Sequence, residues 1–130
     1  IQVARFLKEN YPNGKVFAQD IGAIGYYTNV AMYDVMGLST NEPIRYKRDI
    51  TALRKNLQEQ PNTFAIFWDD ARKEGLPWKY VGRWTISENM ICAGKDVVFL
   101  AKDTTITSEL ERKLQNFSDK HKDLFDANYK

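Results

Sequence analysis

The segment from Val16 to Leu38 constrains the fold of this chain more than any other, because two short apolar runs enclose a glycine-containing turn. Residues 16–18 and residues 30–35 are typical of short buried strands, and the turn that joins them is predicted to be helical. Asp20 follows the first strand, where it could cap this helical turn, and Asp34 lies near the end of the second. We therefore expect two carboxylates at one edge of one sheet.

The same segment resembles a pattern near the C-terminus of polytopic membrane glycosyltransferases, the GT-C superfamily similar to the dolichyl-phosphate-mannose protein mannosyltransferases. The pattern is D-I/V-G-A-I/L-G/A-Y-Y, a short spacer, and a strand of the type I/V-x-D-L/V-x-G-L. The matching residues are Asp20, Ile21, Gly22, Ala23, Ile24, Gly25, Tyr26, Tyr27, Asp34, Val35, Gly37 and Leu38. In such proteins this region is a soluble extracytoplasmic domain after the last membrane helix, and the catalytic acid lies in loops between the early membrane helices.

The resemblance implies that residues 1–130 are a single soluble domain excised from a longer multi-pass membrane protein, at the extracytoplasmic face of the cell membrane. The domain would assist the transfer of a sugar from a lipid-linked donor without being catalytic alone, so no catalytic residue and no cofactor are expected in it. Its expected partners are the membrane-spanning part of the same polypeptide and a carbohydrate or lipid-linked sugar. The chain begins at Ile1 without an initiator methionine, which agrees with excision.

Composition excludes several other classes of function. With 43% hydrophobic and 28% charged residues, 130 residues suffice for one globular domain with one core. Nineteen basic and seventeen acidic residues are interspersed, so no strong field favours nucleic acid as a partner. A single histidine and a single cysteine rule out His/Cys metal clusters, and no metal site is expected. No window approaches the roughly twenty apolar residues that span a bilayer.

The remaining sequence alternates between helical and strand patterns. A helix is predicted over residues 1–10, and a second begins at Asp49, which could cap it, and ends before Pro61. The other predicted elements are strands at Thr63–Trp68, Trp78–Ile86 and Asp96–Ala101, the last two paired antiparallel, and a long helix at Thr107–Asn128. The pattern predicts a small three-layer α/β domain with a mixed sheet of about five strands flanked by helices, and a long C-terminal helix.

Five side chains are candidates for binding a ligand. Asp20, Asp34 and Asp69 follow or end apolar strands, where carboxylates could hold a cation or the hydroxyl groups of a sugar. The structural alternative is that each aspartate caps a helical turn or a loop. Tyr26 and Trp78 could stack on a sugar ring if they are exposed, and the alternative is that both are core residues.

Two further functions stay open beside the one that the resemblance implies. A freestanding carbohydrate-binding module would show sugar affinity in the isolated chain. A small enzyme could use Asp20 and Asp34 as an acid/base pair, because two nearby carboxylates can divide these roles. In that case the substitution Asp34→Asn would abolish a turnover that the isolated chain shows.

Overall fold

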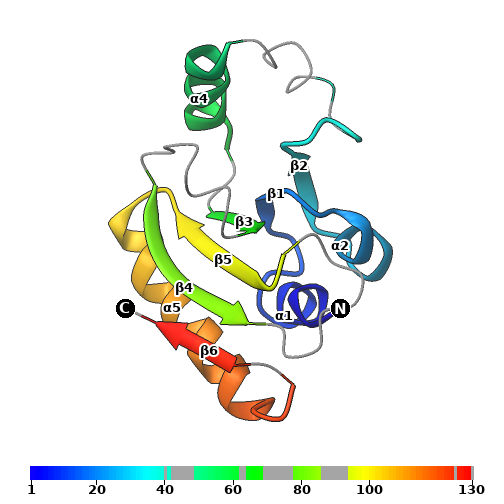
Figure 1. The fold of residues 1–130 in the computed structure, drawn as a ribbon, viewed down its shortest axis with the longest axis vertical. Coiled ribbons are helices and arrows are strands. Elements are labelled where there is room, and N and C mark those ends of the chain that lie inside the picture. The colour runs from blue at the N-terminus through cyan, green and yellow to red at the C-terminus, as the bar shows by residue number, and fades with distance from the viewer. Residues whose placement is uncertain are drawn as a thin grey trace. The chain divides into compact units, whose positions relative to one another are not determined.

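The chain contains both helices and strands in the computed structural model, which describes residues 1–39, 41, 49–61, 64–68, 78–85, 94–124 and 126–129. The chain divides into two compact units, Ile1–Thr63 and Phe64–Lys130. The first unit contains α1 (Gln2–Asn10), β1 (Lys15–Ala18), α2 (Gly22–Tyr27), β2 (Ala31–Asp34) and α4 (Ile50–Glu59). The second contains β3 (Phe64–Trp68), β4 (Lys79–Thr85), β5 (Asp96–Ala101), α5 (Thr104–Lys120) and β6 (Asp126–Tyr129), as Figure 1 shows.

The predicted α/β class is confirmed: the strands form a mixed sheet flanked by helices, with a long helix near the C-terminus. All five predicted strands are present, and their ends agree with the prediction to within one residue. The described residues include six strands rather than about five, because residues 126–129 form β6.

In the first unit, β1 and β2 are parallel, and α2 connects them. Lys15 pairs with Ala31 and Phe17 pairs with Tyr33, so these four side chains share one face of the two strands. Parallel strands cannot be joined by a tight hairpin and need a crossover connection, which residues 19–30 provide. Val16, Phe17 and Ala18 are fully buried in β1.

Glycines have different roles in this segment. A Cβ at Gly25 would lie 3.2 Å from the Cε of Met32, so Gly25 lets α2 pack closely on β2. A Cβ at Gly22 would meet only the Oδ1 of Asp20, at 3.8 Å, so Gly22 has no such close contact. Gly37 has a φ of 79°, a left-handed conformation that ends the segment and favours glycine.

In the second unit, all strand pairings are antiparallel, with β5 between β3 and β4 and with β6 on the other side of β4. The predicted pairing of β4 with β5 is confirmed. Its register shifts between Tyr80 and Gly82, which leaves Val81 as an extra residue in a β-bulge. The side chains therefore do not alternate regularly between the two faces of β4 at this point, and Val81 is fully buried. Helix α5 packs against β4, β5 and β6 (Figure 1).

The predicted bounds of the last helix are wrong at both ends. Helix α5 begins earlier, where the side chain of Asp103 accepts a hydrogen bond from the amide of Ile106 at 2.9 Å. It ends at Lys120, and the segment predicted to continue it turns back and forms β6. Backbone pairing with the edge of β4 outweighs the helical pattern of these residues. Leu124, which follows the end of the helix, is 40% exposed.

Tyr129 anchors β6 to the rest of the second unit. Its hydroxyl accepts a hydrogen bond from the indole Nε1–H of Trp84 at 2.9 Å, and it lies 3.0 Å from two acceptors on α5, the carbonyl of Leu114 and the Oγ of Ser118. Burial raises the pKa of the Tyr129 hydroxyl above its ordinary value. One side chain therefore joins β4, β6 and α5.

The close contact between Tyr129 and Gly82 predicts a loss of stability on substitution. In Gly82→Ala the new Cβ would lie 2.6 Å from Cδ1 of Tyr129, so the ring must shift. We expect the free energy of unfolding to fall by about 1–3 kcal/mol, measured by urea denaturation. The matched control is Gly22→Ala, which has ordinary contacts and should change stability by less than about 0.5 kcal/mol. Equal stability of the two variants would contradict this account of Gly82.

The raised pKa of Tyr129 predicts a stability difference that depends on pH. Unfolded tyrosine ionises near pH 10, whereas the folded Tyr129 stays neutral to higher pH, so its contribution is complete below about pH 10 and is lost as pH rises through the folded pKa. Tyr129→Phe removes the acceptor of the Trp84 indole and should cost about 1–3 kcal/mol at neutral pH.

The urea midpoints of the wild type and Tyr129→Phe should therefore converge as pH rises above about 10. Tyr26→Phe, at an exposed tyrosine, is the control and should follow the wild type at every pH. A difference between the urea midpoints of the wild type and Tyr129→Phe that stayed constant with pH would contradict a raised pKa at Tyr129.

Candidate functional site

The parallel register brings the two aspartates of the sequence pattern to the same end of the first unit. Asp34 is the last residue of β2 and pairs with Ala18, the last residue of β1. Asp20 follows two residues after Ala18. The expected edge therefore exists, but its two carboxylates have different surroundings.

Asp34 is fully buried and holds the backbone of the following loop. Its Oδ1 accepts a hydrogen bond from the amide of Met36 at 2.9 Å, and its Oδ2 accepts one from the amide of Ser39 at 2.7 Å. The amide of Gly37 also donates to the Asp34 carbonyl at 3.2 Å. Both carboxylate oxygens thus stabilise the turn after β2, which favours the loop-capping interpretation over a ligand site.

Asp20 is exposed and has a weak local contact. Its Oδ1 lies 3.4 Å from the amide of Gly22, which is long for a hydrogen bond. Helix α2 begins after Ile21, and Gly22 is its first residue. The exposed Asp20 carboxylate therefore accepts from the first amide of the helical turn, as expected of a cap, although over a long distance.

The aromatic candidates are divided between surface and core. The Tyr26 side chain is 82% exposed and packs edge-to-face on Tyr27, with ring centroids 4.8 Å apart. Trp78, which precedes β4, is only 7% exposed, so its ring does not lie on the surface for sugar stacking. Asp69 lies outside the residues that the structure describes.

Exposed apolar side chains concentrate in the segment that carries the sequence pattern. Among the described residues, the large hydrophobic side chains that are exposed are Ile1, Tyr26, Tyr27, Met36, Leu38 and Leu124. Four of these, which we call the exposed apolar set, fall within residues 26–38: Tyr26, Tyr27, Met36 and Leu38. Tyr26 and Tyr27 end α2, whereas Met36 and Leu38 follow β2, so these side chains are neighbours in sequence that belong to two separate elements.

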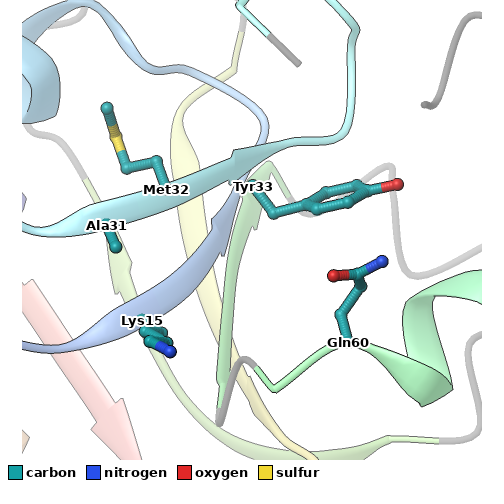
Figure 2. A pocket seen from close by; sticks show the side chains of 5 residues that line it. All are labelled: Lys15, Ala31, Met32, Tyr33 and Gln60. Carbon is teal, nitrogen blue, oxygen red and sulfur yellow. The ribbon is translucent and has the colours of Figure 1, made fainter. Parts of the chain in front are cut away.

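A small hollow, which we call the Tyr33 hollow, lies on the face of β1 and β2 that carries Lys15, Ala31 and Tyr33. It has a volume of about 190 Å³ and is lined by Lys15, Ala31, Met32, Tyr33 and Gln60. Figure 2 shows the ring of Tyr33 projecting from β2 toward the end of α4, where Gln60 lies. Lys15 and Ala31 begin their strands, so the hollow extends toward the end of the strands opposite to the aspartates.

A hydrogen bond between strand and helix forms one wall of the hollow. The hydroxyl of Tyr33 donates to Oδ1 of Asn56 in α4 at 2.6 Å. The ring itself is 6% exposed and contacts Phe17 edge-to-face at 5.4 Å. Sequence reasoning missed this hollow because it placed ligands at the carboxyl ends of the strands. The available signal was the spacing of Asn56 and Gln60, which are one helical turn apart.

Metal-binding clusters and membrane-spanning helices are both absent from the described part of the chain. No group of three or more His, Cys, Asp or Glu side chains among the described residues could hold a metal ion. Within the same residues, no helix has the length and apolar content needed to cross a membrane.

A family model matches most of this chain. The family described as "Domain of unknown function (DUF8728)" matches residues 1–107. This range includes the exposed apolar set and the Tyr33 hollow, and it ends in the first turn of α5. No curated protein and no solved structure matches the chain.

The contacts of Asp34 predict a structural effect of its substitution. Asp34→Asn replaces one of the two carboxylate oxygens by an NH₂ group, which cannot accept a hydrogen bond. The backbone amide of Met36 or Ser39 then has no acceptor at this side chain. We expect the free energy of unfolding to fall by about 1–3 kcal/mol in urea denaturation. Asp20→Asn is the control, and its effect should stay within about 0.5 kcal/mol. An Asp34→Asn variant of unchanged stability that lost a catalytic turnover would instead favour the acid/base hypothesis.

Proposed function

We propose that this chain, which belongs to the DUF8728 family of domains of unknown function, is an extracytoplasmic domain of a membrane-bound glycosyltransferase-like protein. In this role the domain assists the transfer of a sugar from a lipid-linked donor and is not catalytic by itself. Its surface contacts the membrane-spanning part of the same polypeptide or the lipid-linked sugar. The resemblance of residues 20–38 to the pattern of such proteins suggests the role.

The observation that carries the proposal is the exposure of apolar residues within that pattern. Ile24 and Asp34 are buried, and their contacts inside the first unit explain their presence. Tyr26 and Leu38 also match the pattern, but they are 82% and 81% exposed. Packing within the unit therefore does not account for their size or their apolar character. A contact with another molecule or segment outside the unit would account for them, because burying a leucine side chain stabilises a complex by about 1.5–3 kcal/mol.

The chemistry of these side chains suits a membrane-proximal sugar-transfer protein. Tyrosine is enriched at membrane–water interfaces, where its ring is partly apolar and its hydroxyl stays hydrated. The flat face of a tyrosine ring also stacks on the apolar face of a sugar. The Tyr26 and Tyr27 pair offers both properties at the C-terminal end of α2.

The two other functions are less well supported by the geometry. An acid/base enzyme would need both aspartates at one open site, whereas Asp34 is fully buried and both its carboxylate oxygens hold backbone amides. A freestanding sugar-binding module would use the exposed Tyr26 ring in the same way as the domain proposed here. The two differ in whether the native polypeptide is anchored in a membrane.

Membrane fractionation of the source cells tests the proposal directly. An antibody raised against the peptide of residues 16–38 detects, on a denaturing blot, the polypeptide that the cells produce. A large band that stays with the membranes through carbonate washing supports the proposal. A small band in the supernatant overturns it and leaves the freestanding module as the alternative.

Substitutions in the exposed apolar set should impair sugar transfer without unfolding the domain. Tyr26→Ser and Leu38→Ser in the full-length protein should each reduce transfer from a lipid-linked donor by about tenfold, the equivalent of about 1.4 kcal/mol of lost contact. Transfer is measured in washed membranes at equal protein levels. The urea midpoint of this 130-residue chain should not change, because both side chains are exposed.

Leu124→Ser is the matched control, since Leu124 is exposed but lies outside the exposed apolar set. Its transfer rate should equal that of the wild type. If all three serine variants transferred sugar at the wild-type rate, the exposed apolar set would have no part in the reaction.

A further inference from the structure

The second unit contains a slot for the side chain of Tyr129, which we call the Tyr129 slot. It is formed by Gly82 and Trp84 of β4 and by Leu114 and Ser118 of α5. We propose that this slot also accepts Tyr129 from a second copy of the chain, so that two copies exchange β6 and form a dimer. The inference concerns the second unit alone and is independent of the proposed function.

The slot fits a tyrosine both by shape and by hydrogen bonding. Gly82 leaves the space that the ring occupies, because a Cβ there would lie 2.6 Å from Cδ1 and 3.0 Å from Cε1 of Tyr129. The indole Nε1–H of Trp84 donates to the hydroxyl, and the Leu114 carbonyl and the Ser118 Oγ each lie 3.0 Å from it as acceptors. The slot therefore selects a side chain that has both an aromatic ring and a hydroxyl group.

Tyr129 is the residue of β6 whose side chain packs into the second unit. Asp126, Ala127 and Asn128 are exposed, whereas Tyr129 is partly buried. The remaining interaction is the backbone ladder, in which the four residues of β6 pair with Gly82–Thr85 of β4. A strand held by a short ladder and one inserted side chain resembles an extended peptide that binds to the edge of a sheet.

The connection between α5 and β6 is a turn with local hydrogen bonds. The amide of His121 donates to the Ser118 carbonyl at 3.1 Å, and the amide of Leu124 donates to the His121 carbonyl at 3.0 Å. Residues 122–124 of this turn are exposed. Opening the turn therefore breaks mainly local hydrogen bonds and leaves the packing of α5 on β4 and β5 in place.

A second copy of the chain fits the slot because it carries the same strand. In an exchanged dimer, each β6 makes with β4 of the other copy the contacts that it makes with its own β4 in the monomer. This identity of contacts makes strand exchange a low-cost route to a dimer. The short connection gives β6 an effective concentration on the order of 1 mM beside its own β4. We therefore expect mostly monomer at micromolar concentration, with the exchanged dimer as a minor form.

Disulfide trapping between two full-length chains tests the exchange. One chain carries Arg83→Cys and the other Asn128→Cys, both with Cys92→Ser, because Arg83 and Asn128 are directly paired between β4 and β6. Paired residues of antiparallel strands have Cα atoms about 4.5–5.5 Å apart, which is within the range of a disulfide. With oxidised glutathione as the oxidant, we expect a covalent heterodimer joined between positions 83 and 128, identified by mass spectrometry.

Two controls define the background and the geometry of the trap. A chain with Lys8→Cys in place of Arg83→Cys has its thiol at an exposed position on α1, and its heterodimer yield should be lower by about fivefold or more. Arg83→Cys and Asn128→Cys in one chain should form an intrachain disulfide, because β4 and β6 are paired in the monomer. Far-ultraviolet circular dichroism shows whether each variant is folded.

The rate of trapping shows whether β6 has to leave the slot. Tyr129→Phe in both chains removes the hydroxyl that accepts from Trp84, so β6 should open more often and trapping should be faster by about fivefold or more. Tyr26→Phe in both chains, at an exposed tyrosine, should trap at the unmodified rate.

Two results would overturn the inference. A heterodimer yield no higher than that of the Lys8→Cys pair would show that the copies do not exchange β6. Trapping at the same rate with Tyr129→Phe would show that the chains meet while β6 stays in its own slot. Neither result bears on the proposed function, which membrane fractionation and the Tyr26 and Leu38 variants test separately.

Discussion

Parallel pairing of β1 with β2 is the constraint on which the first unit depends. Two parallel strands need a crossover between them, and α2 provides it within a short connection. The helix fits because Gly25 has no side chain where Met32 packs against it. Once the register is set, it fixes which residues lie at each end of the strands. The buried Asp34 and the exposed Lys15 therefore occupy opposite ends of the same pair of strands.

Three successive residues of β2 have three different roles. Met32 contacts the crossover helix, Tyr33 reaches α4 on the opposite face, and Asp34 holds the turn that follows. This division follows from the alternation of side chains along a strand. The sequence pattern contains two kinds of residues. Ile24 and Asp34 are buried within the first unit, whereas Tyr26 and Leu38 are exposed.

The strands and the cap of α4 could be predicted because their signals are local. Continuous apolar runs mark β3 and β5, and the Asp49 side chain accepts from the amide of Ala52 as the sequence predicts. The bulge at Val81 and the strand β6 depend on partners distant in sequence, so no local pattern revealed them. The edge with Asp20 and Asp34 was predicted correctly, but burial decides its chemistry. The Tyr33 hollow needs residues from β1, β2 and α4 together, which only the fold supplies.

The hydrogen bond between Trp84 and Tyr129 shows that the second unit extends beyond the end of the family match. Trp84 lies inside the matched range, whereas its hydroxyl partner and the stacked ring of Phe117 lie beyond residue 107. A recombinant fragment cut at the end of the family match would leave the indole N–H without its acceptor and would uncover the edge of β4. Such a fragment would expose Trp84 and Phe99 to water and tend to aggregate. An expression fragment of this chain should therefore extend through Tyr129 and not stop at residue 107.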